Sequence, residues 1–243
     1  MKLQGNLVPV AELTSVQRAA MLALMKRTYE GITEATFVAD LAEKQWVIVL
    51  EELSSGQLCG FSTQMLLPLR VDDCPVTVLF SGDTVVAQEH WGDAALSHVW
   101  GNLALTLIDR HPVGTLFWAL ISKGYKTYRF LPVFFHEFYP RHDVATPAWA
   151  QALIEAFGHH KFPQAFEAGI IHAHPGKDRL RAGIADVTPA RLRDPHVAFF
   201  ANRNPGHTTG DELCCVAPLT RDNFTDAAYR VIHAKPVVAR VPA

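Results

Sequence analysis

The stretch that decides the fold is SGDTVVAQEHWGDAAL, residues 81–96. A β-branched strand ends here, a tight turn follows, and a helix opens at Gly92 and Asp93, with Asp93 well suited to cap its start. Backbone N–H groups and the positive end of the helix dipole then point toward one spot. That arrangement favours an anion such as a pyrophosphate at the helix start.

Strands and helices alternate on both sides of this stretch. Short apolar or β-branched runs predict strands at 46–50, 58–65, 75–81 continuing into 84–86, and 116–121. Helical spacing predicts a helix pair over 14–44 that breaks at Gly31, a helix from Gly92 to the Asp109–Pro112 stop, and helices over 123–138 and 147–157. Pro132 should kink the 123–138 helix or end it early. In the last third, strands are expected at 168–172, 197–201 and 212–216, and a helix at 221–233.

This order predicts the fold class. Consecutive strands should pair antiparallel, while the strand–helix–strand crossover of residues 76–121 should form a right-handed parallel unit. We therefore expect an α/β (α+β) protein with a mixed, mostly antiparallel sheet flanked by helices. Residues 1–142 are predicted to form the core. Residues 143–243 are predicted to form a mixed extension packed on it, because apolar runs such as VAFF and LCCVA need a covering layer.

Composition excludes several classes of protein. The 243 residues are 49% hydrophobic, and 22 basic residues oppose 24 acidic ones. That balance argues against a nucleic-acid-binding protein. No apolar run is long enough for a transmembrane helix, and the first residues lack the apolar core of a signal peptide. The four cysteines have no framework spacing, so a cytoplasmic protein with reduced thiols is expected. The sequence does not indicate an oligomeric state.

The stretch 81–96 and the elements around it resemble the GCN5-related N-acetyltransferases over roughly residues 5–140. In that family a strand runs into an Arg/Gln-x-x-Gly-x-Gly/Ala loop, and the coenzyme A pyrophosphate sits on the following helix start. The resemblance implies a splay near residues 83–86, where the donor's pantetheine arm enters between neighbouring strands. It implies donor-binding residues Val85, Val86, Gln88, Trp91, Gly92, Asp93, Ala94 and Ala95.

The loop departs from the family pattern at three positions. Trp91 stands where the family usually has Arg or Gln, Ala94 replaces a glycine, and Leu96 replaces a small residue. A donor held there would be bound by backbone N–H groups without an arginine. We therefore expect weak affinity for free coenzyme A, or a donor anchored elsewhere by its acyl chain or by an acyl carrier protein.

Two residues are candidates for proton transfer. Asp83, just before the loop, can take the proton of an attacking amine through water, or it can cap its own backbone in a Ser-Gly-Asp turn. The resemblance implies that Phe138-Tyr139 ends the helix over the donor's thiol, with the Tyr139 phenol protonating the leaving thiolate. The other interpretation of Tyr139 is a core aromatic residue.

The function expected from this sequence is acyl transfer from a thioester donor, acyl-CoA or acyl carrier protein, to a small-molecule amine in a ternary complex. Two basic groups could receive an anionic carrier: Lys123, Lys126 and Arg129, and then Lys177, Arg179, Arg181, Arg191 and Arg193. No tightly bound cofactor is expected. The pair His172 and His174 lacks the motif of a metal site, so no metal is expected either. The alternative is a member of the fold that has lost catalysis and serves as a binding or structural protein.

Overall fold

A computed structural model describes residues 2–233 of the chain. Its main feature is an eight-stranded sheet with the strand order β1-β3-β4-β5-β6-β10-β8-β7. The strands are β1 (Leu3–Pro9), β3 (Trp46–Glu52), β4 (Leu58–Val71), β5 (Cys74–Val86), β6 (Leu116–Ser122), β7 (Phe166–Glu167), β8 (Ile170–Ile171) and β10 (Glu212–Pro218). All neighbouring pairs are antiparallel except β5 and β6, which are parallel. The predicted fold class is confirmed.

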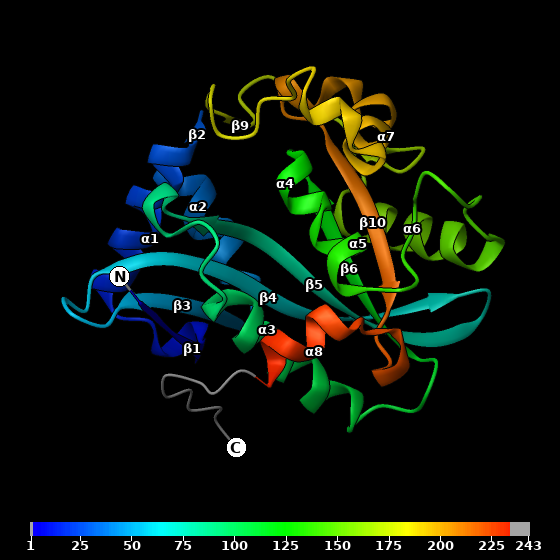
Figure 1. Cartoon of the computed structure of the whole chain (residues 1–243), viewed down its shortest axis with the longest axis horizontal. Helices are drawn as coiled ribbons and strands as arrows, with labels where there is room; N and C mark the ends of the chain where they lie inside the picture. The colour runs from blue at the N-terminus through cyan, green and yellow to red at the C-terminus, as the bar shows by residue number, and fades with distance from the viewer. Residues whose placement is uncertain (1, 234–243) are drawn as a thin grey trace.

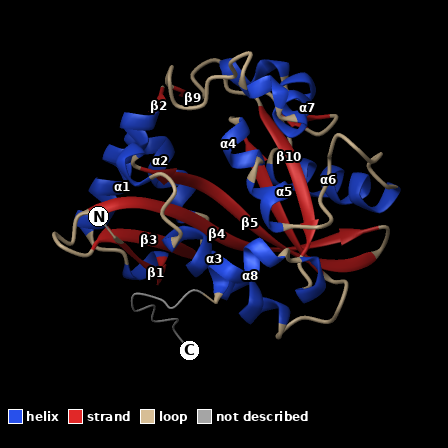
Figure 2. Ribbon diagram, in the orientation of Figure 1, coloured by secondary structure: helices blue, strands red, loops and turns tan. Residues whose placement is uncertain are grey.

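Helices cover both faces of this sheet (Figures 1 and 2). They are α1 (Ser15–Thr28), α2 (Glu34–Ala42), α3 (Ala95–Ile108), α4 (Tyr125–Tyr128), α5 (Phe130–Phe134), α6 (Ala148–Lys161), α7 (Pro195–Arg203) and α8 (Asp226–Ile232). The apolar clusters place α3, α5, α7 and α8 on one face, and α1, α2 and α6 on the other. No helix of residues 2–233 has the length and apolar character that crossing a bilayer requires.

The chemistry of individual residues explains why most elements form where the sequence predicts. Thr14 caps α1 through a reciprocal pair of bonds with Gln17, and Gly31, at φ +83°, separates α1 from α2. In β3, Val47 and Val49 are buried against α1 and α2, while Ile48 and Leu50 are buried against α3. Because helices cover both faces of β3, its sequence is a continuous apolar run and does not alternate with polar residues.

Several sequence-based boundaries were wrong. The strand predicted at 197–201 is part of α7, whose start signals are the cap of Asp194 and the proline after it. The helix predicted over 123–138 is divided into α4 and α5 and ends at Phe134, two residues after the Pro132 that was expected to kink it or end it early, and Phe135 and Tyr139 form bridges with Phe224 and Val216. The helix predicted from Gly92 begins at Ala95, and of the 168–172 strand only β8 forms. The first strand, β1, was missed although its side chains alternate between buried and half-buried.

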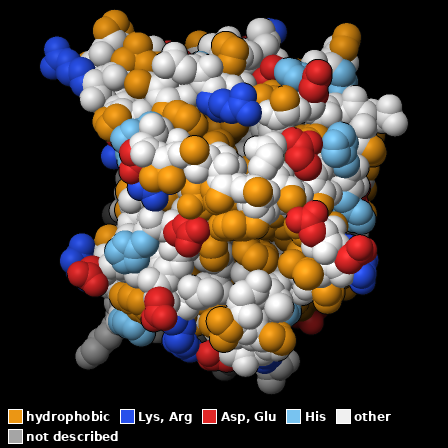
Figure 3. All heavy atoms as spheres, turned by 90° about the vertical axis from the view of Figure 1, so that its right-hand side faces the viewer, with side chains coloured by type: hydrophobic (Ala, Val, Ile, Leu, Met, Phe, Trp, Pro, Cys, Tyr) orange, Lys and Arg blue, Asp and Glu red, His pale blue; other side chains and the backbone are white. Residues whose placement is uncertain are grey.

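The side of the molecule that carries α6 has apolar side chains grouped on its surface. Figure 3 shows apolar side chains across the middle of this face, with acidic, basic and histidine side chains around them. Trp149 of α6 belongs to this flank and stacks on Phe117 of β6 with ring centres 5.7 Å apart. The residues from 143 onward thus contact the sheet directly through α6 and β10.

Truncation after Arg141 is expected to give insoluble protein or protein without a cooperative melting transition. β10 pairs with β6 along Leu213–Pro218, so its loss leaves the β6 edge without a partner in the middle of the sheet. Loss of α6 and α8 also uncovers apolar surface on both faces. Solubility and a calorimetric scan test this. A soluble, cooperatively melting product would show that residues 1–141 form an independent domain. Residues 234–243 of the removed segment lie outside the described part of the chain.

Candidate active site

A cleft opens where β5 and β6 separate. The two strands pair from Thr77–Leu116 to Ser81–Leu120. Beyond this point β5 continues with β4 to Val86, while β6 follows β10 to Ser122, so the strands diverge like the arms of a V (Figure 1). The predicted splay is confirmed. The space between the arms is a cleft with a volume of about 240 Å³.

A β-bulge sets the direction of the residues at the base of the cleft. Ser62 of β4 lies opposite Thr84 and Gln64 opposite Ser81, so Gly82 and Asp83 share one partner position. Such a bulge bends the strand and re-aims its side chains. A Cβ atom on Gly82 would lie only 2.7 Å from Thr63 Oγ1. The side chains of Thr63 and Lys44 fill the space that a side chain at position 82 would need, and the bulge turns Asp83 into the cleft.

The Asp83 carboxyl group has the properties of a base. Among residues 2–233 it has neither a hydrogen bond nor an ion pair within 4 Å, and it lines the cleft. Burial raises its pKa to about 7, the negative charge of Asp40 adds to this, and Lys123 opposes it. A carboxyl with a pKa near neutrality is half ionised at physiological pH, which suits proton transfer.

A buried ion cluster lies across the cleft from Asp83. Lys123, with its side chain 10% exposed, pairs with Asp178, and its Nζ is 3.6 Å from Glu212 Oε1. Lys177 binds the other oxygen of Glu212 at 2.7 Å. Burial alone would lower the pKa of Lys123, but the two carboxylates raise it above its ordinary value. Lys123 therefore stays charged.

Tyr29 is a cleft residue that the sequence analysis missed. It lies in β2 (Tyr29–Glu30), which pairs with β9 (Arg179–Leu180), and the Nζ atom of Lys123 is 5.1 Å from its ring centre. Burial raises the pKa of its phenol above the ordinary range, so the phenol remains protonated and able to donate a hydrogen bond. The feature of the sequence that could have indicated Tyr29 was its position at the end of the predicted helix, next to the break at Gly31.

The eight predicted donor-binding residues divide into two groups. Val85, Val86, Gln88 and Trp91 line the cleft. The other four lie outside its lining: Gly92, Asp93, Ala94 and Ala95. Beyond Ser81 the β5 backbone has β4 as a partner on one side and the cleft on the other. Val85 and Val86 thus present an open strand edge.

The start of α3 already carries a negative charge. The Asp93 carboxylate accepts the Ala95 N–H at 2.8 Å with one oxygen and the Leu3 N–H at 3.3 Å with the other. The N–H groups of Trp91 and Asp93 donate to Gln88 and His90. A pyrophosphate at this position would therefore meet a carboxylate and N–H groups that are already bonded.

Trp91 spans the mouth of the cleft. Its indole is 44% exposed, and its Nε1–H donates to the Val86 carbonyl at 2.9 Å. The Nζ atom of Lys126, from α4 on the opposite arm, is 3.4 Å from the indole ring centre. This cation–π contact joins the two arms of the V. Trp91 is therefore a surface side chain at the mouth of the cleft and is replaceable without disturbing the core.

The Trp91→Arg variant is expected to bind coenzyme A about tenfold more tightly than the unmodified protein. A guanidinium at this place adds a charge-assisted hydrogen bond to a phosphate, worth about 1.5–3 kcal/mol, of which part is lost to repulsion from Lys126. Titration calorimetry measures the change, with Trp91→Gln as the control that removes the indole without adding charge. Tight binding of coenzyme A by the unmodified protein, or equal binding by both variants, would contradict this expectation.

Tyr139, the second predicted catalytic residue, lies elsewhere. Its backbone bonds to Val216 of β10, so β10 and β6 stand between Tyr139 and β5. Its phenol donates to Glu137 at 3.3 Å, and its ring packs edge-on against Trp149. The reason is that the chain leaves the helix at Phe134 and becomes extended. Geometry thus does not bring Tyr139 to Asp83.

Most of the basic residues singled out in the sequence have acidic partners. Arg129 pairs with Asp194, Arg179 and Arg181 with Glu30, and Lys123 and Lys177 with Glu212. Lys126 lines the cleft and has no carboxylate partner among residues 2–233. No group of three or more His, Cys, Asp or Glu side chains in those residues is arranged to hold a metal ion.

The arrangement of the sheet defines the class of fold. The antiparallel strands β3, β4 and β5, the loop and α3, and the parallel strand β6 follow in the order that the family resemblance implies. The fold is that of the GCN5-related N-acetyltransferases. No protein-family model matches the chain, and no curated protein matches it.

Several solved structures resemble part of the chain. A probable N-acyltransferase from Enterococcus faecalis is 12% identical, with a TM-score of 0.43 over 57% of this chain and 33% of that one. A GNAT-family N-acetyltransferase from Escherichia coli, solved with CoA, is 17% identical, with a TM-score of 0.38 over 54% and 69% of the two chains. A Trypanosoma brucei acetyltransferase is 19% identical, with a TM-score of 0.38 over 59% and 100%. The present chain thus spans a third of the first of these proteins.

Proposed function

We propose that this protein is an acyltransferase that moves an acyl group from a thioester donor to an amine. One observation carries the proposal. An unpaired carboxyl group, Asp83, with a pKa of about 7, lies at a bulge where two parallel strands separate around an open cleft. Acyl transfer to an amine requires such a base, because the attacking nitrogen must lose its protons.

The reaction follows from this arrangement. The neutral amine attacks the thioester carbonyl carbon, a C–N bond forms, and the C–S bond breaks. The proton of the amine passes to the Asp83 carboxylate, directly or through water, and the thiolate leaves and takes up a proton. Tyr29, held neutral by burial, is available to donate a hydrogen bond within the cleft. The protein contributes mainly alignment and desolvation of the reactants.

The Asp83 carboxylate indicates the kind of acceptor. The charged side chains that line the cleft balance: Arg27, Lys123 and Lys126 against Asp83, Glu89 and Glu212. Net charge therefore favours neither a cation nor an anion, but the Asp83 carboxylate can accept the proton of an ammonium group beside it and leave the neutral amine. We therefore propose a small amine as the acceptor.

The donor enters from the side of Trp91 and Lys126. The open edge of β5 at Val85 and Val86 can pair with the amide groups of a pantetheine arm, as a further strand would. Lys126 is the cation placed to contact phosphate, in place of the occupied α3 start. Both acyl-CoA and acyl carrier protein carry this arm, so both fit the proposal.

A two-part assay tests the function. Melting temperature with saturating acetyl-CoA measures donor binding, since a ligand that binds only the folded state stabilises it. Release of free thiol and the mass of the acylated product are then followed with a panel of primary amines. We expect stabilisation and amine-dependent thiol release. Absence of both with a folded protein would refute the proposal.

Two observations favour the alternative, a binding protein without catalysis. The start of α3 is occupied by the Asp93 carboxylate, and Trp91 replaces the usual arginine or glutamine. Such a protein would bind the donor but release no thiol with any amine. The same assay therefore separates the two functions.

A further inference from the structure

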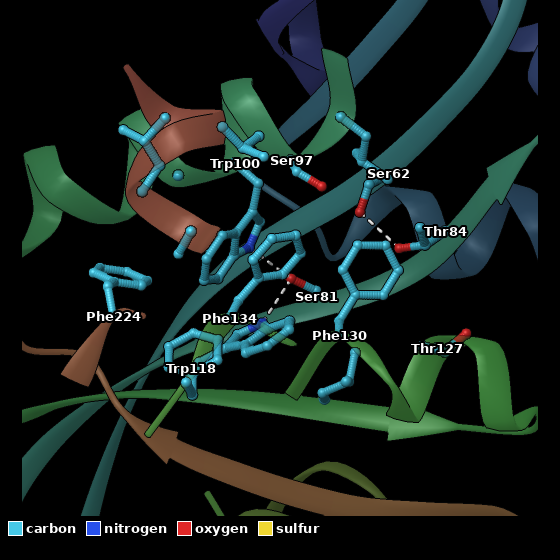
Figure 4. Close-up of a pocket in the computed structure, with 17 residues that line it drawn as sticks. Ser62, Ser81, Thr84, Ser97, Trp100, Trp118, Thr127, Phe130, Phe134 and Phe224 are labelled. Atoms are coloured by element: carbon cyan, nitrogen blue, oxygen red, sulfur yellow. Dashed lines mark hydrogen bonds between the residues drawn. The ribbon is translucent and has the colours of Figure 1, made fainter. Parts of the chain in front are cut away.

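A second cavity lies beneath the closed part of the V, on the α3 face of the sheet. Its walls come from β5 and β6 and from α3, α5 and α8 (Figure 4). Aromatic rings form most of the lining: Trp100, Trp118, Phe130, Phe134 and Phe224. Trp118 of β6 lies two residues before Leu120, where the pairing of β6 with β5 ends. The cavity therefore reaches from the point where the two strands separate to the part of the sheet where they are still paired.

The polar atoms at the base of this cavity are bonded to one another. Ser81 Oγ accepts the indole N–H of Trp118 at 2.9 Å and that of Trp100 at 3.2 Å, and it donates to Gln64 at 2.7 Å. Ser62 and Thr84 bond to each other at 2.7 Å (Figure 4). A buried water needs two to four polar partners, and this wall offers few. The cavity therefore suits an apolar ligand.

The two cavities meet at the reacting position. Thr84 and Thr127 line both of them. Thr84 directly follows Asp83, the proposed base. A thioester carbonyl placed beside Asp83 thus has the polar cleft on its pantetheine side and the apolar cavity within reach of its acyl side.

We propose that this apolar cavity holds the acyl chain of the donor, and that the chain has about six carbons. The inference rests on the proposed acyl transfer and specifies its substrate class. The cavity has a volume of about 50 Å³. By this measure one water-sized group takes about 10–15 Å³, so about four methylene groups fit beyond the two carbons at the reacting position.

The start of α3 gives the physical reason for such an anchor. Because the Asp93 carboxylate already accepts an N–H group at the start of α3, a phosphate there would contribute less to donor binding. Burial of a methylene group contributes about 0.8 kcal/mol, which corresponds to about fourfold in affinity. Four buried methylenes therefore raise donor affinity by about 250-fold, which offsets a weak phosphate site.

Titration calorimetry with acetyl-, butanoyl-, hexanoyl- and decanoyl-CoA tests the inference on the full chain. We expect Kd to fall about fourfold per methylene up to hexanoyl, by about 250-fold in total, and then to level off. Quenching of tryptophan fluorescence by 6-bromohexanoyl-CoA gives a second measurement, because Trp100 and Trp118 form the wall. No quenching despite binding would overturn the placement of the chain.

A variant with a larger side chain in the apolar cavity, together with a matched control, gives a more specific test. Ser97 lines the cavity from the first turn of α3, and Ser97→Leu puts a side chain into the space for the acyl chain. Thr106→Leu makes a similar change on the same helix outside the cavity. Ser97→Leu should bind acetyl-CoA as before and lose most of the gain in affinity from acetyl to hexanoyl, whereas Thr106→Leu should keep it. Melting temperatures show whether both are folded.

The other outcomes decide between the inference and the function on which it rests. Equal affinity for all four thioesters, with amine acylation intact, would overturn the acyl cavity and leave the proposed function standing. An affinity that keeps rising from hexanoyl to decanoyl would overturn the six-carbon limit. Binding of free hexanoate without binding of any thioester would overturn both.

Discussion

Replacement of Asp83 by asparagine is expected to lower kcat for amine acylation by about 100- to 10,000-fold, the usual contribution of a general base. Asparagine has almost the same shape and cannot accept the proton. Donor affinity should stay close to that of the unmodified protein, because the carboxyl is not part of the Val85–Val86 edge or the Trp91–Lys126 contact. A matched control is Asp186→Asn, which changes a carboxylate outside the lining of the cleft.

The pH profile of the unmodified enzyme gives an independent test. Burial raises the Asp83 pKa to about 7, so acylation should rise with pH to half its maximum near pH 7, where the carboxylate forms. The residual activity of Asp83→Asn should lack this step. A profile of the unmodified enzyme without a step between pH 5 and 8 would contradict the assignment of Asp83 as the base.

The same pKa implies an unusual dependence of stability on pH. Between about pH 4 and pH 7 the folded protein keeps a proton on Asp83 that the unfolded chain releases, so this group's contribution to stability falls as pH rises. At pH 8, Asp83→Asn should therefore be more stable than the unmodified protein by roughly 2 kcal/mol. This is about half of what the full pKa shift predicts at 1.36 kcal/mol per pKa unit, because the carboxyl faces a solvated cleft. Urea unfolding of both proteins at pH 5 and pH 8 measures the difference.

Lys123→Met is expected to lower the free energy of unfolding by about 3 kcal/mol, because removing one partner of a buried ion pair leaves uncompensated charge. Asp178 loses its lysine, and Glu212, with a side chain 9% exposed, keeps only Lys177. In a protein of this size the melting temperature should fall by about 10 °C. Arg70→Met, which breaks the exposed pair with Asp73, should change stability by less than about 1 kcal/mol.

Two further measurements show whether Lys123 also acts on the base. Its positive charge lowers the pKa of Asp83, so the midpoint of the pH–activity profile should move above 7 in the Lys123→Met variant. The Lys123→Met/Asp178→Asn double variant removes both charges of one pair and should recover part of the lost stability. An unchanged midpoint together with an unchanged melting temperature would show that the cluster is solvated.

The placement of the predicted donor-binding residues shows what a sequence motif alone cannot resolve. The resemblance treated residues 85–95 as one continuous donor site, but Trp91 lies on the cleft and Asp93 does not. The Asp93 carboxylate is held by the Leu3 N–H from β1, a contact between residues 90 positions apart. No pattern within the loop indicates that partner.

The position of Tyr139 was decided by a strand far along the chain. Aromatic residues at helical spacing favour a helix over 123–138, and the chain does start one at α4. Val216 of β10 then offers backbone N–H and C=O groups, and Tyr139 pairs with both. Satisfying buried backbone groups outweighs local helix preference, so the helix stops early.

The sequence by itself determined the order of the elements from β3 to β6 and the parallel β5–β6 unit, whereas the splay above that unit was implied by the family resemblance. The order and the parallel unit follow from local patterns, namely apolar periodicity, caps and breaks, together with the handedness rule for crossover connections. Only the tertiary structure decided which side chains share the cleft. Tyr29, Asp83, Lys123 and Glu212 come from four distant parts of the chain, and their pKa shifts arise from burial and from one another's charges. Burial and charge proximity exist only once the chain has folded, because both depend on distances in space and not on separation along the sequence.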